Sequence, residues 1–299
     1  MELLGKYMNG NVRTSIYSDD TKERFTMDDE FQPAFAENMD IKICNRCSAG
    51  CSYCHEGSTP GGKLGDIMNE KFVDTLHPYQ EVALGGGNVL EHPDLIPFLH
   101  KLKEKKVITN ITLNQIHFEK NLELVEDIVD QKLIYGLGVS LVNPTDEFIS
   151  KIKEFPNAVI HVINGIFTEQ DYDVLKGHGL KILILGYKDL RRGSEYLYEN
   201  KNKIHKNQNW LEHHIMQMIS GFEVLSFDNL AIEQLHIKEQ WDNLCDEDWD
   251  EFYAGDDGDF TYYIDMVERK FARSSTADFD KRYDLLDDVD KMFRVIQDE

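Results

Sequence analysis

Short apolar runs alternate along the chain with longer amphipathic segments. The apolar runs are continuous, rich in β-branched residues and bounded by Gly, Asn or Pro, which is typical of parallel strands covered on both faces. They occupy 39–44, 81–86, 107–114, 135–142, 158–165, 180–187 and 222–228. The intervening segments space their apolar residues as helices do, and they occupy 69–79, 92–106, 119–132, 144–155, 168–179 and 207–219. This alternation predicts an α/β protein with a parallel sheet.

The number of repeated units favours an open barrel over a closed one. Six strand–helix units followed by a seventh strand suit a partial (β/α)6-type barrel, in which the active site lies at the C-terminal ends of the strands. Before the core, residues 12–25 read as a hairpin that turns at Asp19-Asp20. After it, 253–267 read as a turn leading into a strand or helix, and 281–296 as a closing helix. We therefore predict an N-terminal extension (1–37), a barrel core (38–228) and an acidic C-terminal cap (229–299).

The charge and composition of the chain limit the kinds of partner that it can bind. The 299 residues carry 55 acidic and 32 basic side chains, a formal charge of −23, which disfavours binding to bulk nucleic acid or anionic membranes. The simplest interpretation of this charge is that it keeps the protein soluble. The acid-rich stretches 245–259 and 278–291 leave open the alternative that a cationic partner binds there. The first residues lack the pattern of a signal peptide, and every apolar run is too short to span a bilayer. We expect a cytoplasmic protein.

Four of the five cysteines fall in "CNRCSAGCSYC", residues 44–54, directly after the first predicted strand. Clustered thiols without a secretion signal indicate a reducing compartment and a metal site. A zinc site could use Cys44, Cys47, Cys51 and Cys54, but only three residues separate its two pairs, whereas zinc ribbons use roughly 15–20. A redox dithiol of Cys44 and Cys47 would leave two thiols idle. An iron–sulfur cluster held by Cys47, Cys51 and Cys54 would keep one iron open for a ligand.

Two motifs together resemble the radical S-adenosylmethionine (SAM) superfamily. The first is C-x3-C-x2-C from Cys47 to Cys54 with the aromatic Tyr53 before the last cysteine. The second is "ALGGGNVLEHPDL" (83–95), which is similar to the glycine-rich stretch of that family. The resemblance implies a [4Fe–4S] cluster on the three cysteines and SAM on its open iron.

The glycine-rich stretch has one departure from the family pattern. The resemblance implies that Gly85, Gly86 and Gly87 hold the amino group of the SAM methionine. Asn88 stands where the family has a glutamate, and its amide accepts hydrogen bonds without carrying charge. Glu91, three residues later, is the candidate to supply the missing charge.

Polar residues at the other strand ends complete the candidate site. Asn114, Ser140 and Asn164 end strands three, four and five, where the resemblance implies contacts to the ribose and methionine of SAM; the alternative is that they only satisfy the strand ends. Lys188 and Arg191, with Arg192, form a basic group that either captures an anion, such as a SAM or substrate carboxylate, or lies on a solvated face. Tyr53 is expected to be an aromatic wall beside the cluster.

The resemblance implies a reaction class but no single substrate. SAM would be cleaved reductively to a 5′-deoxyadenosyl radical, which abstracts hydrogen from a small molecule, a nucleotide or a peptide. A reductase, or an electron donor of the flavodoxin or ferredoxin type, would supply the electron. The alternative is a non-catalytic iron–sulfur or zinc protein that uses the barrel as a binding scaffold. This alternative stays open because Asn88 departs from the glutamate of the family pattern. Cys44 lies outside the motif and is expected to be a buried strand-end thiol, and Cys245 is given no role.

Overall fold

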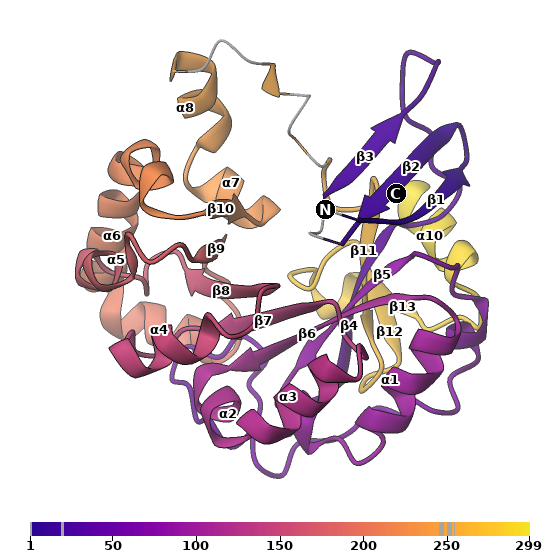
Figure 1. Ribbon diagram of the computed structural model, residues 1–299, viewed down its shortest axis with the longest axis horizontal. Coiled ribbons are helices and arrows are strands. Elements are labelled where there is room, and N and C mark those ends of the chain that lie inside the picture. The colour runs from indigo at the N-terminus through magenta and orange to yellow at the C-terminus, as the bar shows by residue number, and fades with distance from the viewer. Residues whose placement is uncertain (1, 19–20, 245–247, 250–252, 254) are drawn as a thin grey trace.

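A ten-stranded sheet organises most of the molecule in the computed structural model, which describes residues 2–18, 21–244, 248–249, 253 and 255–299 (Figure 1). Its strand order is β10-β9-β8-β7-β6-β5-β4-β11-β12-β13. The strands are β4 (Asn38–Cys44), β5 (Glu81–Gly86), β6 (Ile108–Asn114), β7 (Gly136–Ser140), β8 (Ala158–Ile163), β9 (Lys181–Leu185), β10 (Val224–Phe227), β11 (Thr261–Asp265), β12 (Lys270–Ala272) and β13 (Tyr283–Asp284). Neighbours from β10 to β11 are parallel, and β12 and β13 are antiparallel additions.

The sheet is an open barrel, as the sequence predicts. Within the described residues, its two edge strands β10 and β13 do not pair with each other. Each predicted strand of the core has a counterpart among β4 to β10, and the match follows from their continuous apolar character. In β8, alternate residues are fully buried while those between them are only half-buried, so the strand has one face under the helices and one face toward the lumen.

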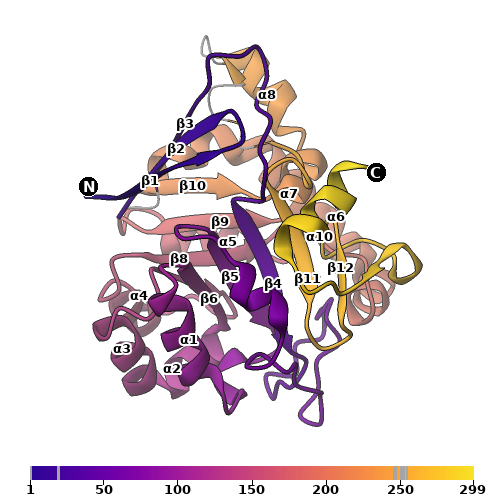
Figure 2. The same cartoon turned by 90° about the vertical axis from the view of Figure 1, so that its right-hand side faces the viewer.

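Most of the described helices lie on the outer face of this sheet, and the second helix after β10 stands away from it (Figures 1 and 2). The described helices are α1 (Leu95–Glu104), α2 (Gln115–Lys120), α3 (Leu122–Asp130), α4 (Asp146–Ile152), α5 (Glu169–Leu175), α6 (Arg192–Met218), α7 (Asn229–Gln234), α8 (Ile237–Leu244) and α10 (Val289–Gln297). Short 3-10 helices occupy Lys71–Thr75, Val89–Glu91, Ile219–Gly221 and Phe279–Lys281. None of the described helices combines the length and apolar composition that crossing a bilayer requires.

The first crossover differs from the expectation of a helix over 69–79. Only the 3-10 helix Lys71–Thr75 forms there, and it buries Phe72 and Val73. The C-terminal helix α10 packs on this segment, where the backbone N–H of Val289 donates to Thr75 Oγ1 at 3.0 Å. A segment from the other end of the chain therefore covers the sheet where a crossover helix was predicted.

The two ends of the chain add to both sides of the barrel core. The N-terminal strands β1 (Leu3–Asn9), β2 (Val12–Tyr17) and β3 (Lys22–Phe25) form a separate antiparallel sheet, which confirms the hairpin predicted at 12–25. Its predicted turn at Asp19-Asp20 lies outside the described residues. The segment 229–299 supplies β11, β12 and β13 as well as α10, and β11 pairs directly with β4. The segment boundaries at 37/38 and 228/229 stay predictions.

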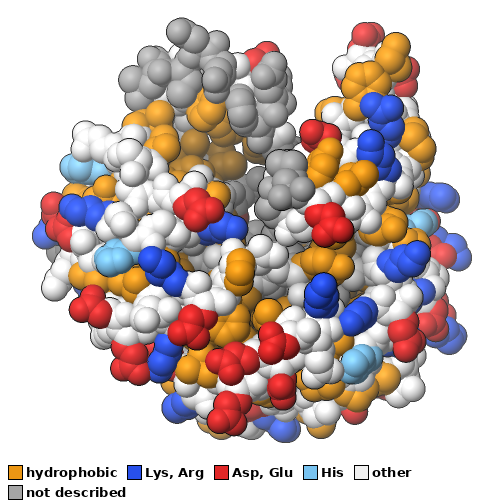
Figure 3. All heavy atoms as spheres, in the orientation of Figure 1, with side chains coloured by type: hydrophobic (Ala, Val, Ile, Leu, Met, Phe, Trp, Pro, Cys, Tyr) orange, Lys and Arg blue, Asp and Glu red, His pale blue; other side chains and the backbone are white. Residues whose placement is uncertain are grey.

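Acidic and basic side chains are interspersed on the face shown in Figure 3, although the chain is strongly acidic overall. This distribution is what solubility requires.

Candidate functional site

The cysteine loop follows β4 at the C-terminal edge of the parallel strands and folds back on itself. The backbone N–H of Asn45 donates to the carbonyl of Lys63 at 2.8 Å, and that of Cys47 donates to Thr59 at 2.9 Å. Gly50 and Gly57 take positive φ values of 69° and 60°, which side chains rarely allow. The loop is thus a fixed platform at the edge where this fold class places its chemistry.

The thiols of this loop influence one another electrostatically, and Cys44 is the most deeply buried of them. Burial raises the pKa of Cys47 and of Cys51, and the neighbouring thiols in the loop add to both shifts. Cys44 is fully buried at the end of β4, and burial raises its pKa to about 11. The expected buried strand-end thiol is therefore confirmed for Cys44. Cys245 lies outside the described residues.

Two side chains from the end of β6 reach the loop. Asn114 Nδ2 donates to Cys51 Sγ at 3.5 Å, and His117 Nε2 lies 3.3 Å from Cys47 Sγ. Burial lowers the pKa of His117, which favours the neutral form of its ring. The sequence predicted Asn114 for this site and missed His117, although a polar residue one turn after a strand end was a usable signal.

The basic group fastens the same loop from the other side. Arg191 Nη1 donates to the carbonyl of His55 at 2.8 Å, and Arg192 Nη2 donates to that of Ser58 at 2.9 Å. The positive charge of Arg192 lowers the pKa values of Cys47 and Cys51 against the effect of burial. Its Nε is buried and has no partner among the described residues. The guanidinium therefore offers a cation and a spare donor beside the thiols.

A buried ion network ties the loop to the barrel wall. Lys42 Nζ lies 2.7 Å from Glu56 Oε2 and 3.2 Å from Asp265 Oδ2, and all three side chains are at most 7% exposed. Burial alone would raise the pKa of Glu56, but His55 and Lys42 outweigh it and hold that pKa well below its usual range. A lone lysine inside an apolar strand is the one sign of this network in the sequence, because the spacing of residues does not indicate its partners.

Two glycines of the turn lie against the protein backbone, and the third faces open space. A Cβ at Gly86 would lie 2.3 Å from the carbonyl oxygen of Cys44, and one at Gly87 would lie 2.2 Å from that of Arg46. A Cβ at Gly85 would meet no protein atom within 4 Å. Gly85 is therefore the position of the turn where a ligand can approach the backbone.

Asn88 and Glu91 form a pair beside this turn. Asn88 is buried, its Oδ1 accepts from the backbone N–H of Leu90 at 3.2 Å, and its Nδ2 donates to Glu91 Oε1 at 3.1 Å. Ser48 of the cysteine loop donates to the same carboxylate at 3.4 Å. The carboxylate of Glu91 therefore lies beside Asn88 at this turn.

The remaining predicted residues are distributed around the lumen. Tyr53 packs edge to face on Tyr196 with ring centroids 5.7 Å apart, and burial raises its pKa to about 12. Ser140 pairs in register with Asn114 and with His161 on the adjacent strands. Asn164 is fully buried and donates to Gln234 Oε1 at 3.1 Å, a contact that joins the end of β8 to α7.

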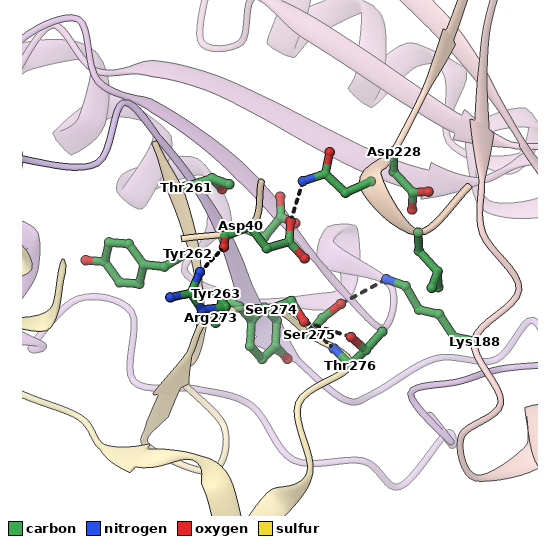
Figure 4. Close-up of a pocket in the computed structure, with 13 residues that line it drawn as sticks. Asp40, Lys188, Asp228, Thr261, Tyr262, Tyr263, Arg273, Ser274, Ser275 and Thr276 are labelled. Atoms are coloured by element: carbon green, nitrogen blue, oxygen red, sulfur yellow. Dashed lines mark hydrogen bonds between the residues drawn. The ribbon is translucent and has the colours of Figure 1, made fainter. Parts of the chain in front are cut away.

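Lys188 lines a polar cavity enclosed by β4, β11, the loop after β12 and the segments that follow β9 and β10 (Figure 4). The cavity is about 80 Å³. Lys188 Nζ donates to Ser275 Oγ at 2.9 Å, from the loop after β12. Asp40 projects into the cavity from β4, and its side chain keeps access to solvent. Partial desolvation raises its pKa, Asp257 and Asp228 add to the shift, and Lys188 opposes it. The sequence singled out Lys188 and missed Asp40, which sits inside an apolar run.

One further lumen residue was missed. His161 projects from β8, and the space at Gly138 accommodates it, because a Cβ there would lie 2.4 Å from its Cε1. Burial lowers the pKa of His161 to about 4, so the ring is neutral. The sequence carried no sign that this strand residue faces the lumen.

The donor set fits an iron–sulfur cluster on three grounds. Three thiols share one fixed loop, two of them have polar side-chain neighbours, and the cation of Arg192 with its unpartnered Nε lies beside them. In the part of the chain that the structure describes, no group of three His, Cys, Asp or Glu side chains is arranged to hold a metal ion. The ligands of a cube bind different irons, so they need not converge on one point.

Comparison with known proteins identifies structural neighbours but no family. No protein-family model matches the chain, and no curated protein matches it significantly. Crystal structures of Streptococcus suis SuiB are similar to it. The complex with the precursor peptide SuiA has a TM-score of 0.52 at 14% identity, and the complex with S-adenosylmethionine has 0.50 at 15%. Each match covers 81% of this chain and 60% of SuiB.

The chain shares its fold with SuiB. At such low identity, the likeness extends to the fold alone. The match spans about 60% of the length of SuiB.

Proposed function

We propose that the protein is a radical SAM enzyme. The observation that carries the proposal is the set Cys47, Cys51 and Cys54 in one fixed loop beside the open backbone of Gly85. The loop lies at the C-terminal strand edge of an open barrel whose fold is shared with a SAM-bound protein. Cys47, Cys51 and Cys54 would hold a [4Fe–4S] cluster. When bound, the cluster supplies an electron that cleaves SAM to methionine and a 5′-deoxyadenosyl radical.

The residues around the loop have assignable roles in this proposal. Gly85 leaves room for the methionine end of SAM, and the carboxylate of Glu91 offers its ammonium a charged acceptor. Arg192 offers a cation for a carboxylate near the thiols. The aromatic ring of Tyr53 would line one side of the cluster site. Ser140 and Asn164 stay candidates for contacts to SAM, with no contact that links them to the loop.

The substrate is proposed as a class. SuiB is bound to a precursor peptide in one of its structures, which supports a peptide among the small-molecule, nucleotide and peptide alternatives. The polar cavity at Asp40 and Lys188 gives the lumen charged groups that can recognise a polar substrate. An electron donor of the flavodoxin or ferredoxin type, or another reductase, completes the proposed system.

Anaerobic reconstitution with iron and sulfide tests this proposal. We expect about four irons per chain, and an electron paramagnetic resonance (EPR) signal of the reduced protein that changes when SAM is added. The open iron is what allows SAM to perturb the signal. A protein that holds iron but whose signal ignores SAM would instead be the non-catalytic iron–sulfur scaffold, and one that holds only zinc would be the zinc-binding alternative.

A further inference from the structure

The short helix α2 begins where β6 ends and presents two nitrogen donors to the cysteine loop. Asn114 is its N-cap, and His117 is its third residue. Asn114 Nδ2 lies 3.5 Å from Cys51 Sγ, and His117 Nε2 lies 3.3 Å from Cys47 Sγ. Two of the three proposed cluster ligands therefore face a donor from the same helix.

Both donors are held in place by the fold. The side-chain oxygen of Asn114 accepts from the backbone N–H of Ile116 at 3.0 Å, which leaves its Nδ2 turned to the thiol. The carbonyl of His117 accepts from the side chain of Asn121 at 2.8 Å, and the ring is only 3% exposed. Two of the three proposed ligand thiols therefore have a side-chain hydrogen-bond donor, and the thiol of Cys54 has none among the described residues.

We propose that His117 and Asn114 donate hydrogen bonds to the thiolates of Cys47 and Cys51 and thereby raise the reduction potential of the cluster. This inference rests on the proposed function, since it requires a cluster on these thiols. A metal-bound thiolate only accepts hydrogen bonds, so Nε2 of His117 carries the proton. The two residues act as positioning and tuning residues of the cluster rather than as its ligands.

The physical reason is the charge that reduction adds. The electron increases the negative charge on the cluster and its sulfurs, and hydrogen bonds to charged acceptors are roughly twice as strong as those to neutral ones. The donors therefore stabilise the reduced form more than the oxidised form. Hydrogen bonds to the sulfurs are one of the factors that set iron–sulfur potentials.

Redox titration of the reconstituted protein, followed by EPR, tests the inference. His117→Leu removes one donor, and its midpoint potential is expected to be more negative than that of the wild type. His117→Gln keeps an amide N–H in reach and should lie between them. His178→Leu, at an exposed histidine, is the matched control and should leave the potential unchanged.

Asn114→Ser gives the same test at the second donor without adding a charge. Its hydroxyl can still cap α2, but the amide N–H that reaches Cys51 Sγ is gone, so the potential is also expected to fall. If His117→Leu does not retain its cluster, this variant decides the question.

Iron content and the reduced EPR signal are measured on every sample to separate the two proposals. A wild type without a cluster overturns the proposed function, and this inference with it. If the wild type holds a cluster and its potential is unchanged in both His117→Leu and Asn114→Ser, this inference alone is overturned.

Discussion

Glu56→Gln tests whether the buried ion network fixes the cysteine loop to the barrel. Glu56 lies two residues after Cys54, is 6% exposed and sits 2.7 Å from Lys42 Nζ. At that distance the pair attracts with about 6 kcal/mol at an effective dielectric of about 20, before the cost of desolvation is subtracted. The substitution leaves Lys42 and Arg282 to share Asp265, which lies 3.2 and 3.6 Å from them.

The net effect is smaller than the gross attraction, because Asp265 still neutralises Lys42. Contacts to charged groups contribute about 1.5–3 kcal/mol, and stripping all partners from a buried charge costs about 3–5 kcal/mol. Glu56→Gln removes one charged partner and leaves another, so its cost should lie near the upper end of the first range and below the second. We therefore expect it to lower the free energy of unfolding by about 2–3 kcal/mol. It should also reduce the iron retained after reconstitution.

Urea unfolding of the metal-free protein measures this loss. The matched control is Asp287→Asn, which breaks an ion pair with Lys71 whose side chains are 65% and 75% exposed. Exposed pairs contribute about 0–1 kcal/mol, so this variant should stay close to the wild type. Equal effects of Glu56→Gln and Asp287→Asn would refute the reasoning.

The same comparison has a defined pH dependence. The pKa of Glu56 in the folded protein lies below its usual value of about 4.3. Its contribution is therefore fully present above that usual value and is lost as the pH falls toward the lowered folded pKa. The difference between wild type and Glu56→Gln should shrink on acidification below about pH 4.

Three further predictions concern the loop and the turn. Cys51→Ala should abolish the iron–sulfur absorbance, while Cys44→Ala should keep it; loss of the cluster in both would make the three-ligand assignment wrong. Glu91→Gln should weaken SAM binding by about 1.5–3 kcal/mol, roughly tenfold to a hundredfold in Kd by calorimetry, and an unchanged Kd would remove its role. Gly85→Ala should keep the melting temperature but weaken SAM binding, whereas Gly87→Ala should cost about 1–3 kcal/mol of stability through its clash with Arg46; the reverse pattern would contradict the open position at Gly85.

Local patterns in the sequence predict the barrel and the place of its site. Continuous apolar runs identify the strands because both faces of a parallel sheet are covered. The ends of such strands lie on one edge, so the sequence predicts that the cysteine loop and Asn114 lie at the same mouth of the barrel. Asn114 does contact Cys51 of that loop, whereas its contact with SAM stays a prediction.

Contacts between distant segments could not be predicted in this way. Lys42 pairs with Asp265, and no spacing rule links residues more than 200 positions apart. The helix expected over 69–79 is replaced by α10 for the same reason, because the segment that covers this part of the sheet comes from the end of the chain.

Reductive cleavage of SAM is the measurement that tests the central claim most directly. The reconstituted protein is incubated with SAM and dithionite under anaerobic conditions, and 5′-deoxyadenosine is quantified by mass spectrometry against Cys51→Ala as the control. The account predicts 5′-deoxyadenosine from the wild type, even without a substrate, and none above background from Cys51→Ala. A wild type that holds its cluster and forms no 5′-deoxyadenosine would contradict the account.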